Sequence, residues 1–197
     1  MTKTVFHHKL FAKGNEIVVI ELGARTTKAA HVRRDGSGCR LVNYAVQDAP
    51  PLEAGSAIQA LAKHLQSVRE TLGAETDRVA LVISMKDTVL RRLELPPVDV
   101  PEMRKLLKSN SKHFFQQDFT GYQFDCYILP VPTSVQVPPT VGGGKKKWVL
   151  VGGAKAALVE HLVAAAKAAH LAPVQVTLSQ VGLIDAALLG LPPEARN

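Results

Sequence analysis

The sequence has few of the features that mark several large classes of protein. Aromatic residues make up only 5% of its 197 residues, so a hydrophobic core must be built mainly from aliphatic side chains. No apolar run approaches the roughly 20 residues that cross a bilayer. The first residues also lack an apolar signal core followed by a small-residue cleavage site. We therefore expect a cytoplasmic globular protein of the α/β or α+β class.

Cysteine is nearly absent, which excludes a disulfide-based scaffold. The two cysteines, Cys39 and Cys126, lack the C-x-x-C spacing of redox and zinc motifs. We expect two reduced thiols and no metal site built on them.

Acidic residues are fewer than basic ones, and the formal net charge is +7. An excess of this sign favours nucleic acid, anionic lipid or an acidic partner, and does not choose among them. The basic residues are scattered apart from Lys145, Lys146 and Lys147, and no aromatic residues alternate with them as in proteins that bind single strands. We interpret the lysine run as a solvated loop and His7 and His8 as exposed residues of an N-terminal arm.

Hydrophobic periodicity predicts strands and helices in both halves of the chain. The first three strands are joined too tightly to be anything but antiparallel, and a helix and an apolar strand follow. Ser56 is the expected N-cap of that helix and Gly73 its stop. The predicted strands are residues 16–22, 28–32, 40–46, 78–84, 88–95, 121–129, 148–151 and 174–178, and the predicted helices are 56–72, 101 onward, 156–169 and from Ser179.

One segment has no regular pattern. Residues 130–147 contain four prolines and three glycines, and we expect a flexible exposed loop or a long hairpin tip. Hydrophobic periodicity places several apolar residues on the inner faces of these elements, and we expect them to be buried: Ile58, Leu61, Leu65, Val82, Leu107, Leu162 and Leu183.

The most specific local feature is residues 20–28, IELGARTTK, which combine a strand, a glycine turn with hydroxyl residues and a second strand. Glycine permits close backbone approach, and the amide groups of such a turn attract anions. The hairpin can hold a phosphate group, although a glycine hairpin is also a common structural element.

The β-β-β-α-β order around this hairpin resembles the first half of an actin-like ATPase domain, in which the same turn is the first phosphate loop. The sequence is similar, more closely, to the PilM family of type IV pilus assembly proteins. That family's opening has an acidic residue, a hydrophobic residue, glycine, two or three serines and a lysine, matched here by Glu21, Leu22, Gly23, Ala24, Arg25, Thr26 and Lys28. Three further blocks, residues 82–97, 102–127 and 148–174, follow in the family's order.

The resemblance implies an α/β fold: an incomplete actin-like (ribonuclease H-like) subdomain 1A, residues 1–85 and 174–197, with an inserted small β/α subdomain 1C, residues 86–173. It implies ATP and magnesium as cofactors, bound through Glu21, Gly23, Ala24, Arg25, Thr26 and Lys28. It also implies that the cytoplasmic tail of a PilN-like inner-membrane protein binds at the junction of 1A and 1C. Arg91, Phe114 and Phe115 are the candidate walls of that groove, and the two phenylalanines also fit a core.

Several residues depart from the family pattern. Glu21 replaces an aspartate that serves the magnesium ion, and Arg25 replaces a small serine. Gln116 and Asp118 stand where the family has prolines. Ser179 and Gln180 replace an aspartate-glutamate pair that would face the nucleotide.

Three functions follow as hypotheses. The first is a cytoplasmic pilus-assembly scaffold that meets the membrane through its PilN-like partner and other assembly proteins. The second is an active ATPase or kinase of the actin-like superfamily, or a GspL-like type II secretion component, and no motif places Asp87, Asp99, Asp118 or Asp125 beside a γ-phosphate. The third is a nucleic-acid binder. We expect no ATP hydrolysis and no tight ATP binding by this chain alone.

Overall fold

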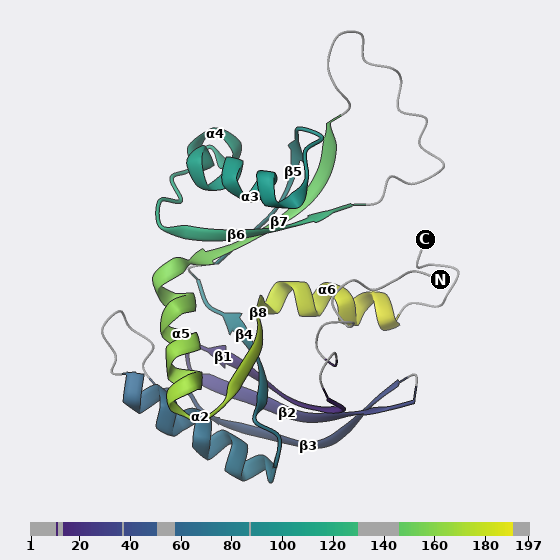
Figure 1. Ribbon diagram of the computed structural model, residues 1–197, viewed down its shortest axis with the longest axis vertical. Helices are drawn as coiled ribbons and strands as arrows, with labels where there is room; N and C mark the ends of the chain where they lie inside the picture. The colour runs from purple at the N-terminus through teal and green to yellow at the C-terminus, as the bar shows by residue number, and fades with distance from the viewer. Residues whose placement is uncertain are drawn as a thin grey trace. The chain divides into compact units, whose positions relative to one another are not determined.

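The computed structural model of the chain describes residues 11, 14–36, 38–50, 58–86, 88–129 and 146–190 (Figure 1). The chain divides into two compact units, Met1–Lys86 with Leu158–Gly182 and Asp87–Ala157 with Leu183–Asn197. His7, His8, Ser56, Asp87 and Lys145, with nearly all of the expected loop, lie outside the described residues. The predicted subdomain bounds, 85/86 and 173/174, stay a prediction.

The first unit is built on a five-stranded mixed sheet in the order β3-β2-β1-β4-β8 (Figure 1). The predicted antiparallel meander is confirmed. Strand β4 then pairs in parallel with β1, and β8 pairs in parallel with β4. Parallel neighbours require crossover connections, which here contain helices. The elements are β1 (Glu16–Gly23), β2 (Thr26–Asp35), β3 (Gly38–Asp48), α2 (Ile58–Leu72), β4 (Arg78–Ser84), α5 (Ala156–Ala168) and β8 (Ala172–Leu178).

Helix α2 packs its apolar face against β2 and β3. Leu61 and Leu65 are buried as predicted, and Val68 and Leu72 continue the same stripe. The prediction was wrong for Ile58, which is 39% exposed. Ile58 is the first residue of α2.

The sheet of the first unit buries one set of alternating side chains beneath α2. Leu81 and Ile83 of β4 are fully buried, as are Ile20 and Leu22 beside them in β1. Val82 was predicted to be buried and is only half-buried. It lies next to Glu21 in the parallel register and so points to the opposite face of the sheet.

The second unit has a three-stranded antiparallel sheet in the order β5-β7-β6, with two helices on one face. Its own core joins both helix and sheet side chains: Val89, Leu95, Met103, Leu107, Phe124, Val149 and Val151. The buried position of Leu107 confirms that prediction. The elements are β5 (Thr88–Leu95), α3 (Val100–Ser109), α4 (Ser111–Phe115), β6 (Tyr122–Ile128) and β7 (Lys147–Lys155).

Two boundaries in this unit differ from the prediction. Strand β7 begins at Lys147, so the irregular segment ends one residue earlier than expected. The prediction gave one helix from residue 101 onward, whereas the chain forms α3 and then a separate short helix, α4. Gln116 ends it with φ 55°, a left-handed conformation that stops a helix after one turn.

The chain's last described helix is α6 (Ser179–Gly190), which begins where it was predicted. Leu162 of α5 is buried as expected, but Leu183 of α6 is 70% exposed. The sequence of α6 is apolar on nearly every side, so its period does not select one inward face. None of the described helices is long and apolar enough to cross a membrane.

Candidate functional site

The carboxyl ends of the three parallel strands meet at one edge of the five-stranded sheet. β1 ends at Gly23 and β4 ends at Ser84, and these two residues are direct neighbours in the register. β8 ends at Leu178, immediately before Ser179. In open α/β sheets, ligands bind outside the carboxyl ends of strands, so this edge is the candidate site.

The turn between β1 and β2 presents Ala24, Arg25 and Thr26, all exposed, at this edge. A Cβ atom on Gly23 would lie 2.8 Å from the carbonyl oxygen of Thr26, closer than side chains pack. The Arg25 carbonyl accepts a hydrogen bond of 2.8 Å from the Ala49 N–H, which ties the turn to the end of β3. Glycine therefore permits a tight, anchored turn with exposed polar groups.

Glu21 and Lys28 face each other across β1 and β2, with 3.8 Å between Lys28 Nζ and Glu21 Oε2. The Lys28 side chain is 62% exposed. An exposed ion pair of this kind contributes at most about 1 kcal/mol to stability. A bound anion can therefore replace Glu21 as the partner of the Lys28 ammonium group.

Thr27 has a different role from its neighbour Thr26. It is buried, and its hydroxyl group forms a 2.8 Å hydrogen bond with Nε2 of His64 on α2. Burial lowers the pKa of His64, which favours the neutral ring at pH 7. Thr27 therefore anchors α2 and does not face the candidate site.

The described residues of this edge fit a phosphate anion better than a metal held by protein alone. Arg25 and Lys28 offer positive charge, and Thr26 offers a hydroxyl group. No group of three or more His, Cys, Asp and Glu among the described residues is arranged to hold a metal ion. Magnesium is commonly held by one or two carboxylates plus substrate phosphates, and Glu21 is the predicted acid that lies beside Lys28 here.

Ser179 and Gln180, the neutral replacements for the family's acidic pair, are the first two residues of α6. They directly follow β8, so they come at the same edge as the Gly23 turn. They supply no carboxylate to that edge.

The predicted partner-binding residues belong to the second unit. Arg91 pairs with Val151, which is buried in the core, so Arg91 shares the sheet face that carries α3 and α4. Its side chain is exposed, and its one described bond is to the Leu90 carbonyl. Phe114 and Phe115 of α4 are half-buried against the same core.

An aromatic cluster that the sequence analysis did not identify holds Phe115 in place. The Phe115 ring stacks on Phe124 with 5.2 Å between centroids and meets Phe119 edge-on at 5.1 Å. Tyr122 completes the group. Aromatic residues two to four positions apart on both sides of Gly121 were the available signal.

The acidic residues considered as catalytic candidates have structural contacts. Asp99 accepts a hydrogen bond from the Glu102 N–H and caps α3. Hydrogen bonds from the hydroxyl and the backbone N–H of Thr120 lower the pKa of Asp118. Asp125 forms an ion pair with Arg104 at 2.6 Å.

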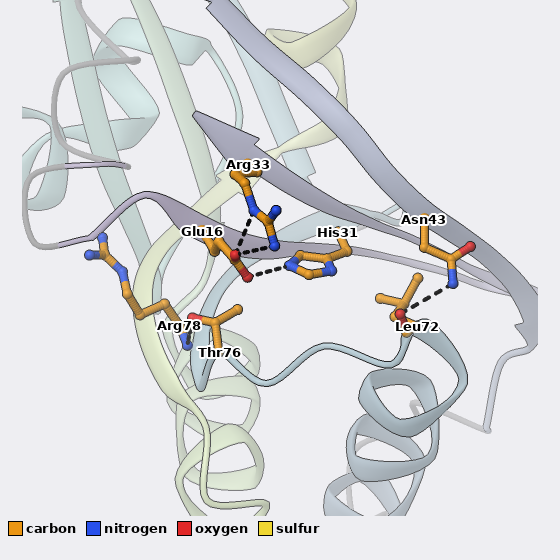
Figure 2. Close-up of polar contacts among 7 residues, drawn as sticks. All are labelled: Glu16, His31, Arg33, Asn43, Leu72, Thr76 and Arg78. Carbon is orange, nitrogen blue, oxygen red and sulfur yellow. Dashed lines mark hydrogen bonds and ion pairs between the residues drawn. The ribbon is translucent and has the colours of Figure 1, made fainter. Parts of the chain in front are cut away.

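A second polar cluster lies at the opposite end of β1 from Gly23 (Figure 2). Glu16 accepts hydrogen bonds from His31 Nε2 at 2.8 Å and from Arg33 Nε at 2.6 Å. The bond from His31, followed by that from Arg33, lowers the pKa of Glu16. A carboxylate only accepts, so the His31 proton is on Nε2, and we interpret the cluster as a structural anchor.

The topology and the glycine turn define the fold of the first unit, which is actin-like as predicted. The first unit has the antiparallel meander and the glycine turn that the sequence predicted for this fold. Strands β4 and β8 extend its sheet in parallel, and the turn lies at the carboxyl end of β1.

Solved structures are similar to this chain in fold. The chain is similar to the PilM-PilN type IV pilus biogenesis complex, with a TM-score of 0.69 and 21% identity, over 88% of this chain and 51% of that chain. It is also similar to the cytoplasmic domain of EpsL, an inner membrane component of the type II secretion system of Vibrio cholerae. That comparison has a TM-score of 0.53 and 14% identity, and covers 90% of this chain and 59% of that one.

A Bacteroides thetaiotaomicron protein with an actin-like ATPase fold and unknown function is similar at a TM-score of 0.47 and 14% identity, over 89% of this chain and 56% of that chain. This chain thus spans between 51% and 59% of the length of these structures. No protein-family model and no curated protein matches its sequence. Similarity at these identities concerns the fold.

Proposed function

We propose that this chain is an actin-like scaffold of a type IV pilus assembly machine, and that it binds the cytoplasmic tail of a PilN-like inner-membrane protein. One observation carries the proposal: the similar solved structure with the TM-score of 0.69 is a complex of PilM with PilN. The ordered sequence blocks that resemble the PilM family support it independently. Attachment to the membrane is then indirect, through the partner.

The second unit offers groups suited to a short peptide. Arg91 is exposed on the face that carries the helices, and a guanidinium group can bind a carboxylate with two parallel hydrogen bonds. Phe114 and Phe115 are half-buried, so their outer parts add apolar surface. A preformed apolar surface with a few polar groups is what peptide recognition requires.

Titration calorimetry with a synthetic PilN-like N-terminal peptide tests the proposal. Loss of a charge-assisted hydrogen bond costs about 1.5–3 kcal/mol of binding free energy. We therefore expect Arg91→Glu to weaken binding at least about tenfold. Arg92→Glu is the matched control. Arg92 is the next residue of β5 and is also exposed, but it stacks over Trp148 at 4.6 Å on the opposite face.

Phe114→Ala should weaken binding as well, while Arg92→Glu should bind like the unmodified chain. No heat at millimolar peptide would remove the main support for the proposed function. If Arg91→Glu and Arg92→Glu lost peptide affinity equally, the peptide would not bind on the sheet face that carries Arg91.

The nucleotide proposal is that this chain neither hydrolyses ATP nor binds it more tightly than about millimolar. In this proposal the candidate site has a single phosphate-binding turn, residues 23–28, and each missing electrostatic contact in such sites costs about 10² to 10³ in rate. Calorimetry with ATP and magnesium, and a phosphate-release assay, check this. Micromolar binding that disappears in Lys28→Ala would contradict it.

A type II secretion component of the GspL class is the second candidate, because the EpsL cytoplasmic domain is also similar in fold. Offering the chain both a PilN-like peptide and the corresponding type II secretion partner separates the two assignments. An active kinase has less support, since Asp99, Asp118 and Asp125 are engaged in caps, turns and an ion pair.

A further inference from the structure

The junction of α3 and α4 in the second unit borders an open cavity with a volume of about 560 Å³. Sites for small molecules commonly have volumes of roughly 300–1,000 Å³. The cavity is lined by residues 108–113, 118 and 120, and every one of these has a polar or charged side chain. An apolar ligand would displace water from these groups without replacing its hydrogen bonds. The lining therefore fits a hydrophilic ligand.

Basic side chains outnumber acidic ones in this cavity. Lys108, Lys112 and His113 all line it. Neither lysine forms an ion pair with any residue in the described part of the chain. The His113 ring meets Phe114 edge-on, with 5.2 Å between centroids, which restrains the imidazole. Ammonium groups only donate hydrogen bonds, so the cavity favours an anion.

Ser111 adds a buried hydroxyl group to the same cavity, because it lines the cavity and is only 8% exposed. Its Oγ atom accepts a long hydrogen bond of 3.4 Å from the Phe119 N–H, but its own proton is donated to no residue that the structure describes. The Ser109 hydroxyl group, by contrast, donates to the Lys105 carbonyl at 3.0 Å. Buried donors normally have acceptors, so Ser111 offers an unused donor to a ligand oxygen.

The cavity lining contains one carboxylate, that of Asp118, and Thr120 holds it in place. The hydroxyl group and the N–H of Thr120 donate to Asp118 Oδ1 at 2.7 and 2.9 Å. These bonds lower the pKa of Asp118, and the charge of Lys112 lowers it further. Asp118 therefore stays ionised at pH 7 and offsets one positive charge. Two lysines against one carboxylate still leave the cavity positive.

We propose that this cavity binds the phosphate group of a small, polar phosphomonoester. Such a group has a charge of about −1.5 to −2 at pH 7 and three strong acceptor oxygens. The ammonium groups of Lys108 and Lys112 and the hydroxyl group of Ser111 supply three donors for these oxygens. A carboxylate has only two oxygens and a single charge, so it would use this lining less completely. The volume leaves room for the sugar, glycerol or other polar group that carries the phosphate.

Glycerol 3-phosphate is a suitable ligand for a nuclear magnetic resonance titration of the isotopically labelled chain. We expect saturable shifts of the backbone amide signals of residues 108–113. Lys112→Gln should weaken binding about tenfold, because hydrogen bonds to charged groups are the strong ones. Lys105→Gln is the matched control and should bind within about twofold of the unmodified chain. Lys105 is also an exposed lysine of α3, but it does not line the cavity.

Two further variants test the individual roles. Ser111→Ala removes the unused donor and should weaken binding by about fivefold to tenfold. Asp118→Asn removes the opposing charge while keeping an acceptor for Thr120, so it should strengthen binding about threefold. An increase in affinity cannot result from partial unfolding, so this variant separates a binding role from a structural one.

Several results would overturn the proposal. One is the absence of saturable shifts at about 10 mM glycerol 3-phosphate. Another is equal weakening by Lys112→Gln and Lys105→Gln, because only net charge would then matter. Binding of polyglutamate without any response to glycerol 3-phosphate would overturn it as well, and would assign the cavity to an acidic protein segment.

Vesicles that contain phosphatidic acid identify the source of the phosphate, because this lipid presents a glycerol phosphate headgroup. Co-sedimentation that Lys112→Gln weakens and Lys105→Gln does not would support the proposal with a lipid as the ligand. Binding of glycerol 3-phosphate without this pattern on vesicles would support it with a soluble ligand. Neither experiment uses the PilN-like peptide or Arg91, so this proposal and the proposed function fail separately.

Discussion

The two cysteines differ in their surroundings although neither forms a disulfide. Cys39 is exposed on β3, whereas burial of Cys126 on β6, with the Asp125 carboxylate nearby, raises its pKa to about 11. The thiolate is the reactive form, so we expect iodoacetamide at pH 8 to modify Cys39 and to spare Cys126 until the chain is unfolded. Peptide mass spectrometry measures both sites, and Cys39→Ser should take up no label when folded. Equal rates at the two thiols would contradict the burial of Cys126.

Glu16 links the stability of the first unit to pH. Hydrogen bonds from His31 and Arg33 lower its pKa, so the folded state favours the carboxylate. A lowered pKa stabilises the folded chain above the unfolded-state value, and this contribution is lost as pH falls below about 4. Glu16→Gln should therefore lower the melting temperature at pH 7. The difference in melting temperature between the variant and the unmodified chain should become smaller below pH 4. Thermal melts across this pH range measure that difference. A difference that grows in acid would contradict the prediction.

At the scale of one element, α3 depends on its N-terminal cap. Asp99 accepts the Glu102 N–H at 2.9 Å, and a proline occupies the first turn. Removal of an N-cap acceptor costs about 1 kcal/mol, so Asp99→Ala should lower the free energy of unfolding by about that amount. Asp99→Asn keeps an acceptor and should lose much less. Urea denaturation distinguishes the two variants, and identical losses would show that the cap bond does not contribute.

The elements also show where periodicity succeeds and where it does not. β1 was predictable because an apolar run too short for a helix ends at Gly23. α4 was not, since one helical turn contains too few residues to express a period. α6 was placed correctly in sequence, yet its uniformly apolar composition misled the prediction for Leu183.

At the scale of the whole molecule, each unit has its own core. Leu65 is fully buried in the first unit and Leu107 in the second. Changing either to Ala should cost about 2–5 kcal/mol. We expect hydrogen exchange to rise in β5, β6 and β7 for Leu107→Ala, and in β1, β2 and β4 for Leu65→Ala. Equal loss of protection throughout the chain in both variants would show that the cores unfold as one.

The sequence by itself determined most of the elements, the antiparallel meander and the glycine turn, because these depend on local spacing and on residues such as Gly23 that local geometry restricts. Only the tertiary structure decided which residues from distant segments meet. Gly23 and Ser84 are neighbours through a parallel register, Thr27 faces His64 rather than the phosphate edge, and Arg91 shares the face of Val151. The exposure of Leu41, Tyr44 and Val46 on β3 was likewise not predictable from the sequence. Alternation predicts which side chains share a face, but whether anything covers that face depends on contacts between segments far apart in the chain.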